Sequence, residues 1–177
     1  MSKTPMIAGL LAATLLLVAA TPEAQAQRAR GHVTVPNAAG GVTSAGGAVT
    51  SGARGKAARG RVTTTDGQGN ATRRSGGVVQ GSNGGTASRQ GSAYRNADGS
   101  AGRQGSAQAQ GANGGSATTS GSLARDAEGN VNGSRSTSAT AANGNSYAGS
   151  TTVTDGQVSR TATCTDAAGN SIACRNP

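Results

Sequence analysis

The chain has 177 residues, with no Phe, no Trp, only two Tyr and 30 Gly. Beyond Gln27, the only large aliphatic residues are Leu123, Ile172 and ten valines. Ordering a residue costs about 1–2 kcal/mol, and small polar side chains bury too little apolar area to offset that cost, so we exclude a conventional hydrophobic core. The remaining possibilities are disorder, a thin β array held by backbone hydrogen bonds, or order gained on assembly.

Residues 1–26 are predicted to be a cleaved signal peptide. Lys3 supplies a positive start, residues 6–20 form an apolar run, and Ala24-Gln25-Ala26 fits the small-x-small rule for cleavage after Ala26. The alternative is a membrane anchor, but a run of about 15 residues is shorter than the roughly 20 that a spanning helix needs. We therefore expect a secreted or periplasmic protein with no integral membrane segment after cleavage.

Residues 27–60 are expected to form a basic, Gly/Ala-rich, disordered arm. The formal net charge of the whole chain is +9. The densest basic region runs from this arm to the first residue of the next segment: Arg28, Arg30, Arg54, Lys56, Arg59 and Arg61. Such an arm could bind a polyanion through counterion release, and the partners would be surface polysaccharide, lipid phosphate or extracellular DNA. The interpretation we favour here is that the charge keeps a low-complexity chain soluble. Aromatic stacking platforms are missing from the arm, so specific nucleic-acid recognition is not expected.

Residues 61–150 contain a fifteen-residue repeat. A glycine recurs at six successive positions, and each is preceded by an acid or an amide: Gly69, Gly84, Gly99, Gly114, Gly129 and Gly144. Asn-Gly and Asp-Gly pairs are typical of tight turns, because glycine adopts a positive φ without strain. A fixed period of this kind indicates one supersecondary unit used many times.

About ten residues separate successive turns, which predicts one strand per repeat. We expect a mostly disordered or marginal all-β protein, whose order would be an antiparallel hairpin meander, with a solenoid as the structural alternative. Strict hydrophobic alternation is absent, so the register would depend on the turns alone. A hairpin centred on Gly99 would place Arg95 opposite Arg103, an unfavourable pair of like charges.

Residues 151–177 are predicted to form a C-terminal hairpin closed by a disulfide. Cys164 and Cys174 are the only cysteines, and each lies five residues from Gly169, so a hairpin centred there would bring them face to face. In an exported protein such a pair is normally oxidised. A metal site or a redox pair is the alternative, but the spacing is not that of CxxC and the single histidine, His32, is remote.

Catalytic interpretations lack the necessary residues. A nucleophilic triad needs a base, and His32 is alone. The acidic residues coincide with the predicted turns, where Asx hydrogen bonding explains them. A calcium-binding roll would need acids in fixed columns, and an ice-binding array would need threonines in register; neither pattern is present. We expect no enzyme activity, no cofactor and no metal.

Two segments, 125–130 (Arg-Asp-Ala-Glu-Gly-Asn) and 165–170 (Thr-Asp-Ala-Ala-Gly-Asn), resemble the turn half of YD/RHS repeats, the large β-spirals of secreted bacterial proteins. The tyrosine that precedes the aspartate in that family is absent here. Gln80-Gly81-Ser82-Asn83 and Gln110-Gly111-Ala112-Asn113 are similar to curlin-type amyloid repeats in composition but not in spacing. The resemblance implies only a class: bacterial, extracellular or surface-bound, repetitive and non-enzymatic.

The sequence therefore predicts an exported structural or adhesive repeat protein, with self-association as a further possibility. The alternative hypothesis is a polyanion-binding module that uses the basic N-terminal arm.

Overall fold

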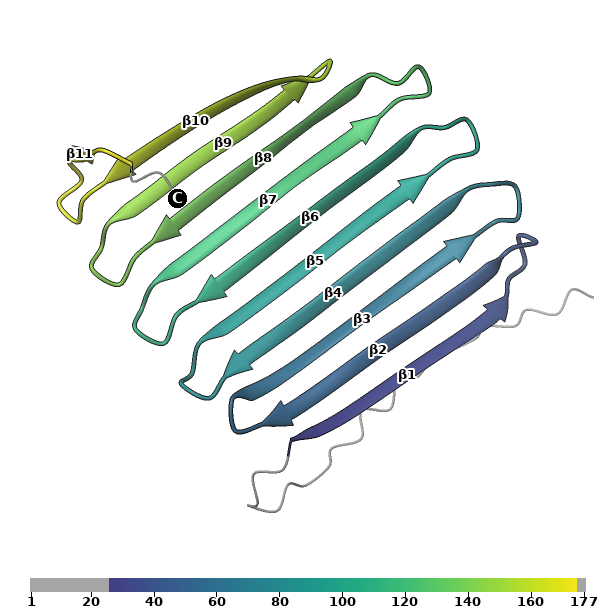
Figure 1. Ribbon diagram of the computed structural model, residues 1–177, viewed down its shortest axis with the longest axis horizontal. Coiled ribbons are helices and arrows are strands. Elements are labelled where there is room, and N and C mark those ends of the chain that lie inside the picture. The colour runs from purple at the N-terminus through teal and green to yellow at the C-terminus, as the bar shows by residue number, and fades with distance from the viewer. Residues whose placement is uncertain (1–25, 175–177) are drawn as a thin grey trace, which may run out of the picture.

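The computed structural model describes residues 26–174, so the predicted signal peptide lies almost wholly outside the described residues. The chain forms a single antiparallel sheet of 11 strands (Figure 1). The strands are β1 (Gln27–Pro36), β2 (Val42–Gly52), β3 (Gly55–Thr65), β4 (Ala71–Gly81), β5 (Thr86–Arg95), β6 (Ala101–Gln110), β7 (Ser116–Arg125), β8 (Val131–Thr140), β9 (Ser146–Thr154), β10 (Gln157–Thr165) and β11 (Ser171–Ile172). Each strand pairs with the next in the sequence, so the predicted meander is confirmed.

The fifteen-residue repeat corresponds to one strand and one turn. Strands β4 to β9 begin at intervals of fifteen residues, at Ala71, Thr86, Ala101, Ser116, Val131 and Ser146. All six repeat glycines have positive φ, between 87° and 99°. In the β5–β6 turn, the Gly99 N–H donates to the Asn96 carbonyl (3.1 Å) and the Asn96 N–H donates to the Ser100 carbonyl (2.9 Å). This is a three-residue hairpin loop, a type I turn followed by a left-handed glycine.

The loop geometry corrects the register expected from sequence. The centre of the β5–β6 hairpin is Asp98 and not Gly99, because Arg95 pairs with Ala101 and Arg103 pairs with Ala93. The opposition of Arg95 and Arg103 that the sequence suggested therefore does not occur. Each arginine faces an alanine across the strands, which removes the like-charge cost.

The disorder expected for residues 27–60 is not supported, because this segment forms β1, β2 and β3. Pairing between β1 and β2 extends from Gln27 with Ser51 to Pro36 with Val42, and β3 pairs with β4 along its whole length. The expectation of disorder considered only what side chains can bury. In this sheet, each strand is instead held by the backbone groups of its neighbour, which small residues leave accessible.

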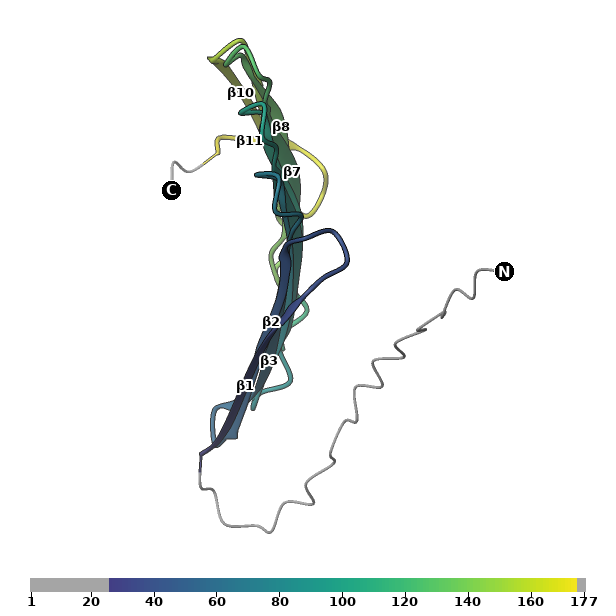
Figure 2. The same cartoon turned by 90° about the vertical axis from the view of Figure 1, so that its right-hand side faces the viewer.

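The sheet is one layer thick and has solvent on both sides (Figure 2). None of the described residues is classed as buried, and eight valines are exposed. The fold is therefore held by ladder hydrogen bonds, by turns and by cross-strand side-chain pairs. No helix long and apolar enough to cross a membrane occurs in the part of the chain that the structure describes.

The predicted Cys164–Cys174 disulfide is confirmed, with the two Cα atoms 5.3 Å apart. The hairpin that carries it is again shifted from the expected centre at Gly169. Cys164 pairs across the strands with Ile172, so Cys174 lies beyond the end of β11 and bonds to β10 from there. The bridge fastens the short last strand to the edge of the sheet.

Candidate functional site on the arginine face

The strand register assigns every strand residue to one of two faces. Directly opposed residues of an antiparallel pair point to the same face, and neighbours along a strand point to opposite faces. Because fifteen is odd, residues one repeat apart lie on opposite faces: Gly76 and Gly91 occupy the same place in their repeats, yet Gly91 pairs with Ser75. The sequence period that preserves both face and row is therefore two repeats, or thirty residues.

One face, which we call the arginine face, carries eleven arginines: Arg28, Arg30, Arg59, Arg61, Arg73, Arg89, Arg95, Arg103, Arg125, Arg135 and Arg160. The opposite face of the strands carries only Lys56 and Arg74 as basic residues. This segregation of charge is the most distinct chemical feature of the molecule.

The structure places the six basic residues named from the sequence in three different environments. Four of them, Arg28, Arg30, Arg59 and Arg61, share the arginine face. Lys56 points to the opposite face, and Arg54 lies in the turn between β2 and β3. The cluster in the sequence is thus only partly a cluster in space.

Seven arginines of this face were missed by the sequence analysis: Arg73, Arg89, Arg95, Arg103, Arg125, Arg135 and Arg160. A detectable pattern was present. Arginines recur at a spacing of thirty residues in the pairs 59/89, 73/103 and 95/125. The two arginines of each pair lie two repeats apart, because residues only one repeat apart lie on opposite faces.

Within a row that crosses the sheet, a small residue separates each arginine from the next. One row contains Arg30, Ala48, Arg59, Gly77 and Arg89 on β1 to β5. Strands lie about 4.8 Å apart, so successive arginines in this row are about 10 Å apart. The spacing avoids direct like-charge pairs, and we call the place over each alanine or glycine between two arginines a slot.

The same pattern occurs in two further rows. Arg73 and Arg103 are separated by Ala93, and Arg95 and Arg125 are separated by Ala101. At one place the face is hollowed to about 660 Å³, with alanines of β3, β5, β6 and β7 as its floor and with Arg28, Arg59, Arg89 and Arg135 around it. Arg135 is oriented by its Nε, which donates to the Thr119 hydroxyl at 3.2 Å.

No acidic residue lies on either face of the strands. All six acids of the described chain are in turns: Asp66, Asp98, Asp126, Glu128, Asp155 and Asp166. Four of them accept backbone hydrogen bonds within their turns: Asp66, Asp98, Asp126 and Asp166. A hydrogen bond from the Asn130 side chain is the main cause that lowers the pKa of Asp126, and Asn70 and Asn170 lower the pKa of Asp66 and Asp166 in the same way. Because these carboxylates lie at the strand ends, the positive charge of the arginine face is not compensated within the face.

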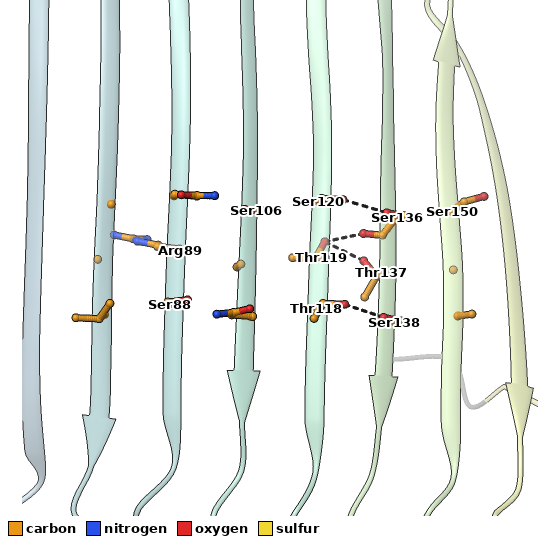
Figure 3. A pocket seen from close by; sticks show the side chains of 18 of the residues that line it. Ser88, Arg89, Ser106, Thr118, Thr119, Ser120, Ser136, Thr137, Ser138 and Ser150 are labelled. Carbon is orange, nitrogen blue, oxygen red and sulfur yellow. Dashed lines mark hydrogen bonds between the residues drawn. The ribbon is translucent and has the colours of Figure 1, made fainter.

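The opposite face differs along the sheet. Over β5 to β10 it carries rows of hydroxyl groups, which we call the hydroxyl patch; one row runs Ser106, Ser120, Ser136, Ser150 and Thr161. Several of these groups bond across strands, as Figure 3 shows for Thr118 with Ser138 (2.7 Å) and Ser120 with Ser136 (3.2 Å). The hydroxyl patch carries no charged side chain.

The remaining candidate residues form no reactive centre. His32 lies on β1 and its Nε2 is 2.8 Å from the Ser44 hydroxyl. Between residues 26 and 174, no three or more His, Cys, Asp or Glu side chains gather in a way that could hold a metal ion. Comparisons with protein-family models, curated proteins and solved structures found no match.

Proposed function

We propose that this protein is an exported, non-enzymatic platform that binds an anionic polymer through its arginine face. The observation that supports the proposal is the placement of eleven of the thirteen basic strand residues on one face that contains no acid. The proposal joins the structural or adhesive role and the polyanion role expected from sequence. It replaces the flexible basic arm with a rigid, two-dimensional array.

The slots between arginines suit oxyanions. A guanidinium group donates two parallel hydrogen bonds to a carboxylate, sulfate or phosphate, and these charge-assisted bonds are the strong ones. In the row of Arg59, Gly77 and Arg89, the missing side chain of Gly77 leaves room for one such group between two arginines. The same arrangement recurs across the sheet, so a polymer with repeated anionic groups contacts many equivalent positions.

The array favours affinity without sequence recognition. Each contact releases counterions from the polymer, which makes binding strongly dependent on salt. An open face on which one charged group repeats offers little to discriminate among polymers except charge spacing. This behaviour is typical of an adhesive or matrix-organising protein. Export is part of the proposal, in keeping with the disulfide, and the partner would then be an extracytoplasmic polyanion.

The test compares two double variants with the same change in net charge. Arg59→Gln with Arg89→Gln removes two neighbours of one row on the arginine face, and Lys56→Gln with Arg74→Gln removes the two basic strand residues of the opposite face. Binding to dextran sulfate and to single-stranded DNA is measured across a salt series. For DNA, the first variant should reduce the slope of log affinity against log salt by about 1.4, because each lost phosphate contact removes about 0.7.

The opposite-face variant should bind like the wild type. Equal losses in both variants would show that net charge and not the arginine face controls binding, and would refute the proposal. Binding by the wild type that does not depend on salt would refute it as well.

A further inference from the structure

The face opposite the arginines is apolar over β1 to β4. Five of the eight exposed valines lie there, each between 43% and 55% exposed, and we call them the valine patch: Val33, Val35, Val49, Val62 and Val78. Isolated exposed valines are ordinary on protein surfaces, but a contiguous group on one sheet face is a feature of docking surfaces. Only Lys56 and Arg74 bring charge to this area.

Large and small residues alternate along the patch from strand to strand. One row crosses β1 to β4 as Ala29, Val49, Ala58 and Val78. A second row runs Val33, Ala45, Val62 and Arg74. Between the two rows lies a row of four glycines: Gly31, Gly47, Gly60 and Gly76.

We propose that the valine patch binds the valine patch of a second copy of this chain, around a two-fold axis that lies parallel to the strands between β2 and β3. This axis reverses strand order while keeping each row in place. Ala29 then faces Val78 of the second copy, and Val49 faces Ala58 of the second copy. Every valine of that row meets an alanine, which is the interdigitation that close packing of two layers requires.

The other rows are compatible with the same axis. In the second row, Ala45 faces Val62 of the second copy. The aliphatic part of the Arg74 side chain of one copy covers Val33 of the other. In the central row, glycine faces glycine, so the two backbones can approach closely. Near the end of the strands, Gln27 of one copy faces Gln80 of the other, and these two amides can hydrogen-bond to each other. The sheets need only the aligned packing that is usual for stacked sheets, with strands within about 30° of each other.

The size of the patch is adequate for a dimer of moderate affinity. Four strands about 4.8 Å apart and ten residues long at about 3.3 Å per residue cover about 600 Å² on each copy. The total of about 1,200 Å² is at the lower end of the range for specific interfaces. Covering the patch would also give the valines of this single-layer sheet the interior that they lack in one copy.

The charge distribution selects a second copy stacked through this face. Stacking through the arginine faces would oppose two arrays of like charge. The hydroxyl patch extends beyond the overlap in both directions and stays hydrated. Both arginine faces remain on the outside, so the dimer would offer two binding surfaces pointing in opposite directions. The dimer itself does not depend on the proposed binding of polyanions.

The test uses adjacent residues on opposite faces. Val78 is 55% exposed and Val79 is 52% exposed, and they point to opposite sides of β4. Analytical ultracentrifugation of the mature protein over a wide micromolar range should show a reversible dimer. Val78→Lys should raise the dissociation constant of the dimer by more than about ten-fold, because the interface would bury an unpaired charge. The matched control, Val79→Lys, should dimerise like the wild type.

A crosslinking measurement protects the test against a variant that fails to fold. In the proposed dimer, Ala29 lies over Val78 of the second copy, whereas the two residues are three strands apart within one chain. The double variant Ala29→Cys with Val78→Cys, treated with a short bis-maleimide, should give a covalent dimer. Arg28→Cys with Val79→Cys has the same separation on the arginine face and should not.

A wild type that stays monomeric throughout would overturn the inference. Equal effects of the two lysine variants, or equal crosslinking of the two cysteine variants, would overturn it too. Loss of polyanion binding with an intact dimer would contradict only the proposed function.

Discussion

The turn at Gly99 allows a quantitative test of why the repeat needs its glycine. Gly99 has φ +88°, and a Cβ added there would meet no atom within 4 Å. The cost of Gly99→Ala therefore comes from backbone strain alone. An L-residue in the left-handed region costs about 1–2 kcal/mol, and the reduced entropy of the unfolded alanine chain returns about 0.4–1 kcal/mol. The expected net destabilisation is about 1 kcal/mol.

Gly99→Asn is the matched variant, because asparagine tolerates the left-handed region better than alanine does. It should cost clearly less than Gly99→Ala at the same position. Native-state hydrogen exchange of the β5 and β6 amides is the assay, since a long repeat array need not unfold in one step. A loss of about 1 kcal/mol corresponds to a roughly five-fold drop in protection. If alanine and asparagine cost the same, or if alanine stabilises, the left-handed conformation is not what selects glycine.

Three further predictions concern the turn carboxylates, the disulfide and the signal peptide. The pKa of Asp126 is lowered, chiefly by the Asn130 side chain, so its carboxylate stabilises the fold above the unfolded pKa and that contribution is lost as the pH falls through the folded pKa. Asp126→Asn should lower the stability of the β7–β8 hairpin at neutral pH and flatten its acid dependence; an unchanged acid profile in hydrogen exchange would contradict this role. Reduction of Cys164–Cys174 should destabilise the C-terminal edge by about 2.5–3 kcal/mol, or roughly 100-fold in exchange protection. The intact mass of exported protein should match residues 27–177 less two hydrogens, and retained residues 1–26 would refute the signal-peptide prediction.

Local features of the fold were predictable from the sequence. The acid or amide before each repeat glycine located the turns, because turn chemistry is a property of a few adjacent residues. The distance between turns then predicted strand length. The two cysteines, equally spaced about a predicted turn, predicted the disulfide. None of these inferences requires knowledge of a distant residue.

The register was not predictable, and the rows of the candidate site depended on it. A three-residue loop places the centre of the β5–β6 hairpin at Asp98, and a centre at Gly99 would change every cross-strand partner by two positions. The order of residues 27–60 was missed for a related reason. Its strands are stabilised by hydrogen bonds to the neighbouring backbone, which composition does not reveal.

The two chemically different faces exist only in the folded sheet. Arg59 and Arg89 lie in one row because antiparallel pairing restores both face and row after thirty residues, and Arg73 shares their face because side chains alternate along each strand. Composition determined that the chain is basic and poor in large apolar residues. Tertiary structure alone decided that eleven arginines lie on one side and most N-terminal valines on the other, because pairing register converts position along a strand into position on a face.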